Sequence, residues 1–132
     1  MTNFINVIGL GYIGLPTALM FAKHGVNVVG TDYNEELVKS LDRGELLFEE
    51  KKLNETFEQA KKNGIKFTTE YQRTHTYIIA VPTPYLKESK KLDPSYLISA
   101  IQSVLHNCEK GAIIVIEYTI SPGTTDKYIR PE

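Results

Sequence analysis

The segment FINVIGLGYIGLPTALMFAKHGVNVVGTD, residues 4–32, limits most strongly what this chain can fold into. An apolar run, Phe4–Ile8, favours a buried strand, and Ile13–His24 has the apolar spacing of a helix. A second apolar run, Val26–Gly30, follows Gly25, which stands where a glycine is expected to end a helix. The segment therefore predicts a strand, a turn, a helix and a second strand parallel to the first.

The glycines of GLGYIG each have a separate task in this turn. Gly9 allows the tight turn after the strand, Gly11 removes a side chain where a pyrophosphate would approach the backbone, and Gly14 lets helix and strand pack closely. The amides at the start of the helix would face the anion along the favourable end of the helix dipole. A bare GxGxxG also occurs in ordinary tight turns, but in this context it indicates a dinucleotide-binding turn.

The second predicted strand leads to Asp32, 23 residues after Gly9. A carboxylate at this place can accept hydrogen bonds from both ribose hydroxyls of an adenosine. Asp32 would repel a 2'-phosphate, and neither Tyr33 nor Asn34 is an arginine that could neutralise one, so the sequence predicts NAD rather than NADP. The alternative is that Asp32 only begins a turn before Asn34, which is a good N-cap for the next helix.

Short apolar runs continue to alternate with helical segments, which predicts βαβ units and a parallel sheet. Helices are expected after the cap Asn34 through Leu41, over Leu53–Lys62, and from the cap Asp93 to His106. Strands are expected at Ile65–Thr68, Tyr77–Val81 and Ala112–Glu117, and a lysine-rich loop at Pro84–Lys91. The predicted fold class is α/β, a Rossmann-like doubly wound parallel sheet in three layers, α/β/α, that stops before its last strand.

Two polar segments follow later strands of the predicted sheet, where strand ends line the ligand crevice. YIIAVPTPY places Val81, Pro82 and Thr83 beside the cofactor, and Pro82 and Pro84 fix an extended exit from the strand. IEYTISPGTT ends the fifth strand, so the hydroxyl of Thr119 would reach the same crevice. Taken alone, the first segment could be a rigid loop, and the second a strand, a turn and a helix start.

Composition argues against several other classes of protein. The chain has 132 residues, a net charge of -1 and a single cysteine, Cys108, so an internal disulfide is excluded. The charge balance does not indicate nucleic-acid binding, and the apolar runs are far shorter than the roughly 20 residues of a membrane span. The N-terminus shows no signal-peptide pattern, and a cytoplasmic location is expected. The histidines lack the spacing of a metal site, so no metal is expected.

Taken together, GLGYIGLPTA, AVPTP and EYTISPGTT resemble the N-terminal domain of the UDP-glucose/GDP-mannose dehydrogenase family, over nearly the whole chain. GYIGLPTA and AVPTPY are most similar to the members that oxidise UDP-N-acetyl-D-mannosamine, with UDP-glucose oxidation as the alternative. A nucleotide-sensing regulatory domain would share the glycines and the acid but lack the two later segments. The resemblance implies NAD, a UDP-sugar substrate, two-step oxidation of the sugar C6 alcohol to a carboxylate, and a homodimeric full-length enzyme.

The resemblance also assigns residues to the site. Those assigned to cofactor binding are Gly9, Leu10, Gly11, Tyr12, Ile13, Gly14, Asp32, Val81, Pro82, Thr83 and Thr119. Thr83 and Thr119 would line the nicotinamide side, and Thr119 would have an auxiliary catalytic role in positioning a water. The chain departs from the family at Tyr118, where serine is usual, and at Lys51, where proline is usual.

The cysteine nucleophile and the lysine that stabilises the oxyanion are implied by the resemblance to lie beyond residue 132. Cys108 cannot replace that nucleophile, because it is expected at a helix end on the side of the sheet away from the crevice, as a small packing residue. Residues 1–132 are therefore expected to be the cofactor domain of a longer dehydrogenase, inactive by itself.

Overall fold

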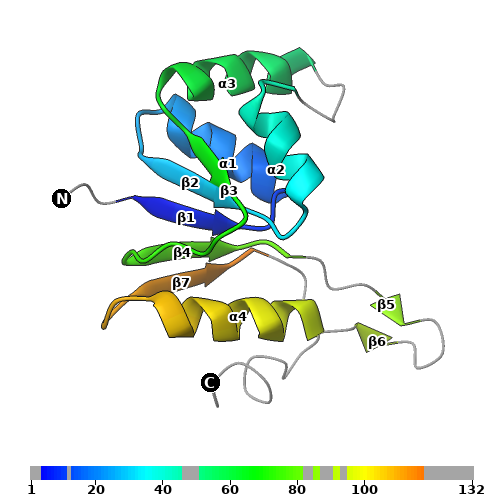
Figure 1. The fold of residues 1–132 in the computed structure, drawn as a ribbon, viewed down its shortest axis with the longest axis vertical. Coiled ribbons are helices and arrows are strands. Elements are labelled where there is room, and N and C mark those ends of the chain that lie inside the picture. The colour runs from blue at the N-terminus through cyan, green and yellow to red at the C-terminus, as the bar shows by residue number, and fades with distance from the viewer. Residues whose placement is uncertain are drawn as a thin grey trace.

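A parallel sheet with helices on both faces forms the centre of the computed structural model, which describes residues 4–11, 13–45, 51–81, 85–86, 91–92 and 95–117 (Figure 1). The strands of this sheet are β1 (Ile5–Ile8), β2 (Val28–Thr31), β3 (Lys66–Thr68), β4 (Thr76–Ile79) and β7 (Ile113–Ile116). The helices are α1 (Gly14–Lys23), α2 (Glu35–Asp42), α3 (Lys51–Lys62) and α4 (Ser95–Asn107).

The strand order is β3-β2-β1-β4-β7, and every neighbouring pair is parallel. The order reverses beside β1, because the chain first builds outward through β2 and β3 and then continues on the other side with β4. The register sets Ile8 beside Thr31 on one side and beside Ile79 on the other, so three strands end at the same level. In open α/β sheets this point of reversal is where ligands bind.

Side chains of the sheet alternate between two cores, one on each face. Val7 and Ile78 belong to the core that α1, α2 and α3 cover, whereas Ile8, Tyr77 and Ile79 belong to the core that α4 covers. Figure 1 shows the three helices gathered over the β3-β2-β1 half and α4 along β4 and β7. The predicted α/β/α layering and doubly wound sheet are confirmed.

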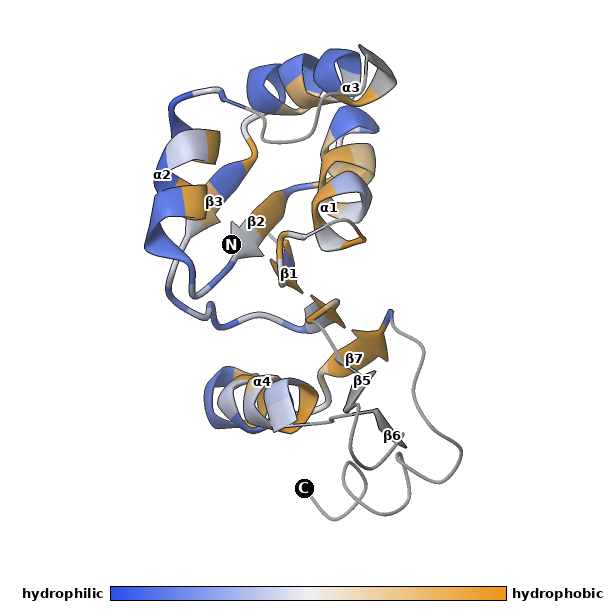
Figure 2. Cartoon of the chain, turned by 90° about the vertical axis from the view of Figure 1, so that its right-hand side faces the viewer, coloured by the Kyte–Doolittle hydropathy of each residue, from blue (hydrophilic) through white to orange (hydrophobic). Residues whose placement is uncertain are grey.

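Hydropathy follows this layering. In Figure 2 the outer surfaces of α2 and α3 are hydrophilic, and β7 is hydrophobic along its length. β7 is an edge strand of the described sheet, and on its α1 side Ile113 and Val115 remain 62% and 46% exposed. None of the helices in the described ranges has the length and apolar character that crossing a membrane requires.

Several element boundaries differ from the sequence prediction by one or two residues, and one expected loop contains short strands. β2 begins at Val28 rather than Val26, because Gly25 (φ 89°) ends α1 and the N–H of Val26 still bonds back to the carbonyl of Phe21 at 3.0 Å. Within the expected loop at 84–91, β5 (Tyr85–Leu86) pairs antiparallel with β6 (Lys91–Leu92). Strands of two residues are too short to show an alternating pattern. The predicted cap Asp93 lies outside the described residues.

An irregular segment, residues 69–75, joins β3 to β4 across the face of the sheet that α4 also covers. The fully buried side chain of Asn6 holds this crossover. Its amide donates to the carbonyl of Val29 at 2.9 Å and to Oγ1 of Thr31 at 2.8 Å, and its oxygen accepts the N–H of Gln72 at 3.1 Å. Buried polar groups are normally hydrogen-bonded, and Asn6 meets this need with its bonds to β2 and to the crossover. These bonds hold in place a segment that has no helix to pack on the sheet.

Replacing Asn6 by alanine should lower the free energy of unfolding by about 2–4 kcal/mol, because the partners of its amide and oxygen would be left unpaired in the interior. Urea unfolding followed by circular dichroism measures the loss. Asn54→Ala, on the exposed face of α3, is the matched control and should change stability by less than about 0.5 kcal/mol. Equal losses in the two variants would contradict the role given to Asn6.

Candidate functional site

The turn between β1 and α1 lies at the reversal point of the sheet and packs directly on the end of β4. Gly9 has φ 95°, and a Cβ atom there would lie 2.7 Å from the carbonyl oxygen of Ala80. The N–H of Gly9 donates to the carbonyl of Thr31 at 2.8 Å, and that of Ala80 to the carbonyl of Ile8 at 2.8 Å. Only glycine fits this place, for both conformational and steric reasons.

The other two glycines of the motif have different surroundings. A Cβ atom at Gly14 would overlap the carbonyl oxygen of Gly9 and lie 3.2 Å from Cβ of Ala80, so Gly14 allows α1 to start against the turn. This confirms the packing role predicted for Gly14. Gly11 is exposed, and a Cβ atom there would meet nothing within 4 Å. The main chain at Gly11 is therefore open to an approaching group.

The positive end of α1 is also open. Its N-cap position is occupied by the apolar Ile13, and its first turn carries no acidic residue. In contrast, α2 begins with Asn34, whose side chain accepts the N–H of Leu37 at 3.2 Å, followed by Glu35 and Glu36. The described side chains thus compensate the dipole of α2 but not that of α1, which suits an anion from outside the protein.

Asp32 joins the turn to the start of α2. Its Oδ2 accepts the N–H of Leu10 at 2.8 Å, and its Oδ1 accepts the N–H of Asn34 at 2.9 Å. Each carboxylate oxygen has a further lone pair, so these bonds leave capacity for the two ribose hydroxyls that the sequence predicts as partners. The sequence analysis did not predict the bond to Leu10. The bond to Asn34 did have a known signal, because an Asp side chain often accepts the N–H two residues further on.

Leu10 supports the turn from beneath. Its side chain is fully buried and lies against β2, where a Cβ atom at Gly30 would come within 2.9 Å of Leu10 Cδ2. Its N–H is already donated to Asp32. The close approach explains a glycine in the middle of a strand. A cofactor contact of Leu10 stays a prediction.

Two of the remaining predicted site residues, Ile13 and Val81, are described by the structure, and the others are not. Ile13 is 42% exposed beside the turn, and Val81 is buried, with its main-chain nitrogen 3.1 Å from where a Cβ of Gly9 would be. Outside the described residues lie Tyr12, Pro82, Thr83, Tyr118 and Thr119. Their roles stay predictions.

A contact that the sequence analysis missed links α1 to the end of β7. The hydroxyl of Thr17 lies 2.8 Å from Oε2 and 3.0 Å from Oε1 of Glu117. A hydrogen bond to an ionised carboxylate is among the stronger ones. It ties the helix that follows the glycine turn to the strand that leads toward Thr119. A threonine inside an otherwise apolar helix was the available signal.

Cys108 and the histidines lie away from this edge, at element ends. Cys108 follows α4, is partly buried against the α4 core, and precedes Glu109, whose N–H bonds to the carbonyl of Thr74 just before β4. This confirms its packing role and its place at the amino edge of the sheet. His75, also before β4, pairs with the carboxylate of Glu109.

Comparison with known proteins gives a family and near relatives. The family model "UDP-glucose/GDP-mannose dehydrogenase family, NAD binding domain" matches residues 3–132. A UDP-N-acetyl-D-mannosamine dehydrogenase of Methanococcus maripaludis (strain S2) is 46% identical over 127 residues, which are 93% of this chain and 30% of that protein.

Solved structures agree with this finding. A UDP-N-acetyl-mannosamine dehydrogenase from Staphylococcus aureus superposes with a TM-score of 0.92 at 40% identity, over 98% of this chain and 32% of the other. A UDP-D-ManNAc dehydrogenase from Pyrococcus horikoshii gives 0.88 at 39% identity, over 96% and 31%. The chain thus spans about a third of the length of the proteins it matches.

Alanine at Gly14 and at Gly11 should have opposite effects on stability. Gly14→Ala should lower the free energy of unfolding by about 3 kcal/mol, because main chain must move to admit the methyl group. Gly11→Ala should change it by less than about 1 kcal/mol, since the methyl group enters open space. Thermal unfolding of both variants measures the difference. A Gly11 variant as unstable as the Gly14 variant would contradict this description of the turn.

Proposed function

The chain belongs to the UDP-glucose/GDP-mannose dehydrogenase family, as its NAD-binding domain, and we propose that it is the cofactor-binding part of a UDP-N-acetyl-D-mannosamine dehydrogenase. In this proposal, residues 1–132 act within a longer, homodimeric cytoplasmic enzyme. The observation that carries it is the carboxylate of Asp32, which is bonded to the N–H of Leu10 and stands beside the open turn at Gly11.

The residues present fit NAD. The exposed main chain at Gly11 and the uncompensated start of α1 would receive the pyrophosphate. Asp32 would accept the hydroxyls of the adenosine ribose. When bound, NAD supplies the acceptor for hydride removed from the sugar. The chain's own contribution is to hold that acceptor at the reversal point of the sheet, where Thr17 and Glu117 join α1 to β7.

The remaining chemistry would come from parts of the enzyme beyond these residues. Oxidation of a C6 alcohol to a carboxylate removes four electrons, so two NAD molecules would be reduced in turn. The thiol that holds the intermediate and the lysine that stabilises its oxyanion would belong to the rest of the enzyme. The named relatives support the choice of sugar. The described residues do not contribute to this choice, because none of them is assigned a contact with the sugar.

NAD should bind this chain at least about tenfold more tightly than NADP, because a 2'-phosphate would meet the charge of Asp32. The basic residue of α2, Lys39, is paired with Glu35 at 3.7 Å. Calorimetric titration with both dinucleotides measures the preference. Asp32→Asn keeps an acceptor for the N–H of Leu10 but removes the charge, and it should weaken NAD and reduce the preference. Equal affinities of the parent chain for NAD and NADP would contradict the role of Asp32.

An assay of the full-length gene product tests which UDP-sugar is the substrate. NADH formation, followed by absorbance, should be at least about tenfold more efficient with UDP-N-acetyl-D-mannosamine than with UDP-glucose, because a pocket built for one substituent rejects another. The two UDP-sugars serve as controls for each other. Preference for UDP-glucose would overturn the substrate but leave the family unchanged.

A further inference from the structure

Asn63 and Gly64 follow α3 and form the one Asn-Gly pair of the sequence. Both residues are exposed, so water reaches them. A Cβ atom at Gly64 would meet nothing within 4 Å, and the main chain there is open on that side. Glycine also lacks the side chain that would otherwise stand between its nitrogen and the preceding residue. At this pair an asparagine side chain can therefore react with its own main chain.

The reaction that such a pair undergoes is deamidation. The nitrogen of Gly64 attacks Cγ of Asn63, the bond from Cγ to Nδ2 breaks, and ammonia leaves with the proton of the Gly64 nitrogen. Water then opens the resulting cyclic imide at either of its carbonyl groups. One opening gives aspartate, and the other gives isoaspartate, in which the main chain runs through the side-chain carbon. Water is consumed, ammonia is released, and no oxidant or reductant takes part.

Hydrogen bonds hold both reacting groups in the folded chain. Nδ2 of Asn63 donates to the carbonyl of Ala22 at 2.8 Å and to that of Lys23 at 3.1 Å. The N–H of Gly64 donates to the carbonyl of Lys61 at 3.1 Å. The attack requires the Gly64 nitrogen to leave Lys61 and the side chain of Asn63 to turn toward it. The contact with α1 therefore restrains the reaction, and local opening at the end of α3 releases it.

The product does not fit this contact. Ala22 and Lys23 are the last residues of α1, so their carbonyls lie at the negative end of its dipole. An ionised carboxylate accepts hydrogen bonds but donates none, so it would lose both bonds and be repelled. Isoaspartate would also lengthen the main chain just before Ile65, which is buried in the core that α1 and α3 share.

We propose that Asn63 is a site of deamidation, that the carbonyls of Ala22 and Lys23 restrain it while α3 lies on α1, and that conversion breaks this contact. Figure 1 shows α3 beside α1. The contact lies at the end of α1 opposite the glycine turn, and its chemistry involves no cofactor. The proposal is therefore independent of the proposed function.

Peptide mass spectrometry tests the site and its restraint. The parent chain is kept at mildly alkaline pH, with and without guanidinium chloride. Loss of the side-chain amide is followed at Asn63 and, as the control in the same sample, at Asn54, which is exposed in α3 and precedes Glu55. In denaturant, Asn63 should convert at least about tenfold faster than Asn54, because only Asn63 precedes a glycine.

Without denaturant, Asn63 should convert at least about tenfold more slowly than with it, because the rate then follows the fraction of molecules in which the contact is open. If Asn63 converts no faster than Asn54 in denaturant, the modification site is overturned. If the folded and unfolded chains convert at equal rates, the restraint by α1 is overturned.

A variant that reproduces one product tests the effect on the contact. Asn63→Asp should lower the thermal midpoint of unfolding by about 4 °C or more, because both bonds to α1 are lost and the new charge faces its carbonyls. Gln59→Glu adds the same charge at an exposed position in the last turn of α3, and should lower the midpoint by less than about 2 °C. Circular dichroism measures both midpoints. Equal shifts would overturn the claim that conversion breaks the contact.

Discussion

The contact of main chain with main chain at the glycine turn is the constraint on which the candidate site depends. Gly9 meets Ala80 at the end of β4, and Gly14 meets the carbonyl of Gly9, with no side chain between them. This brings the start of α1 to the level at which β1, β2 and β4 end. The open main chain at Gly11 and the uncompensated helix dipole then face the same space, at the reversal point of the sheet.

Asp32 has a role in the fold and, in the proposed function, a second role toward the ligand. Its carboxylate bonds to Leu10 and Asn34, and so fixes the turn and the start of α2 before any ligand is present. A group held by two hydrogen bonds offers its remaining lone pairs in a defined direction, and this preorganisation reduces the entropy lost on binding. Asn6 of β1 acts similarly on the crossover, since its bond to the N–H of Gln72 holds the segment that carries Tyr71.

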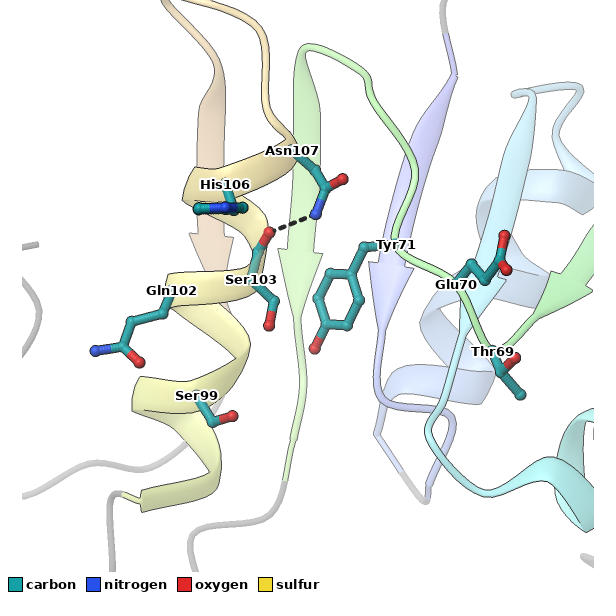
Figure 3. Close-up of a pocket in the computed structure, with 8 residues that line it drawn as sticks. All are labelled: Thr69, Glu70, Tyr71, Ser99, Gln102, Ser103, His106 and Asn107. Carbon is teal, nitrogen blue, oxygen red and sulfur yellow. Dashed lines mark hydrogen bonds between the residues drawn. The ribbon is translucent and has the colours of Figure 1, made fainter.

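The sequence predicted the layers because apolar periodicity and the glycine spacing are local signals. Gly9 and Gly14 could be interpreted from spacing alone, and so could the caps Asn34 and Gly25. Contacts between distant residues could not, because the bond of Thr17 to Glu117 spans 100 positions and no period marks it. The groove between residues 69–71 and α4 (Figure 3) was equally hidden, since it depends on a crossover without a helix.

The two helix starts at this edge show a balance between stability and binding. An N-cap such as Asn34 contributes about 1 kcal/mol, and α1 lacks that contribution because Ile13 stands at the corresponding place. An anion that binds only the folded chain stabilises it and can offset the missing cap. This stabilisation grows with the logarithm of the anion concentration divided by the dissociation constant. In the proposed function the dinucleotide would bind at this uncapped start of α1, and its binding would therefore stabilise the helix end that lacks a capping side chain.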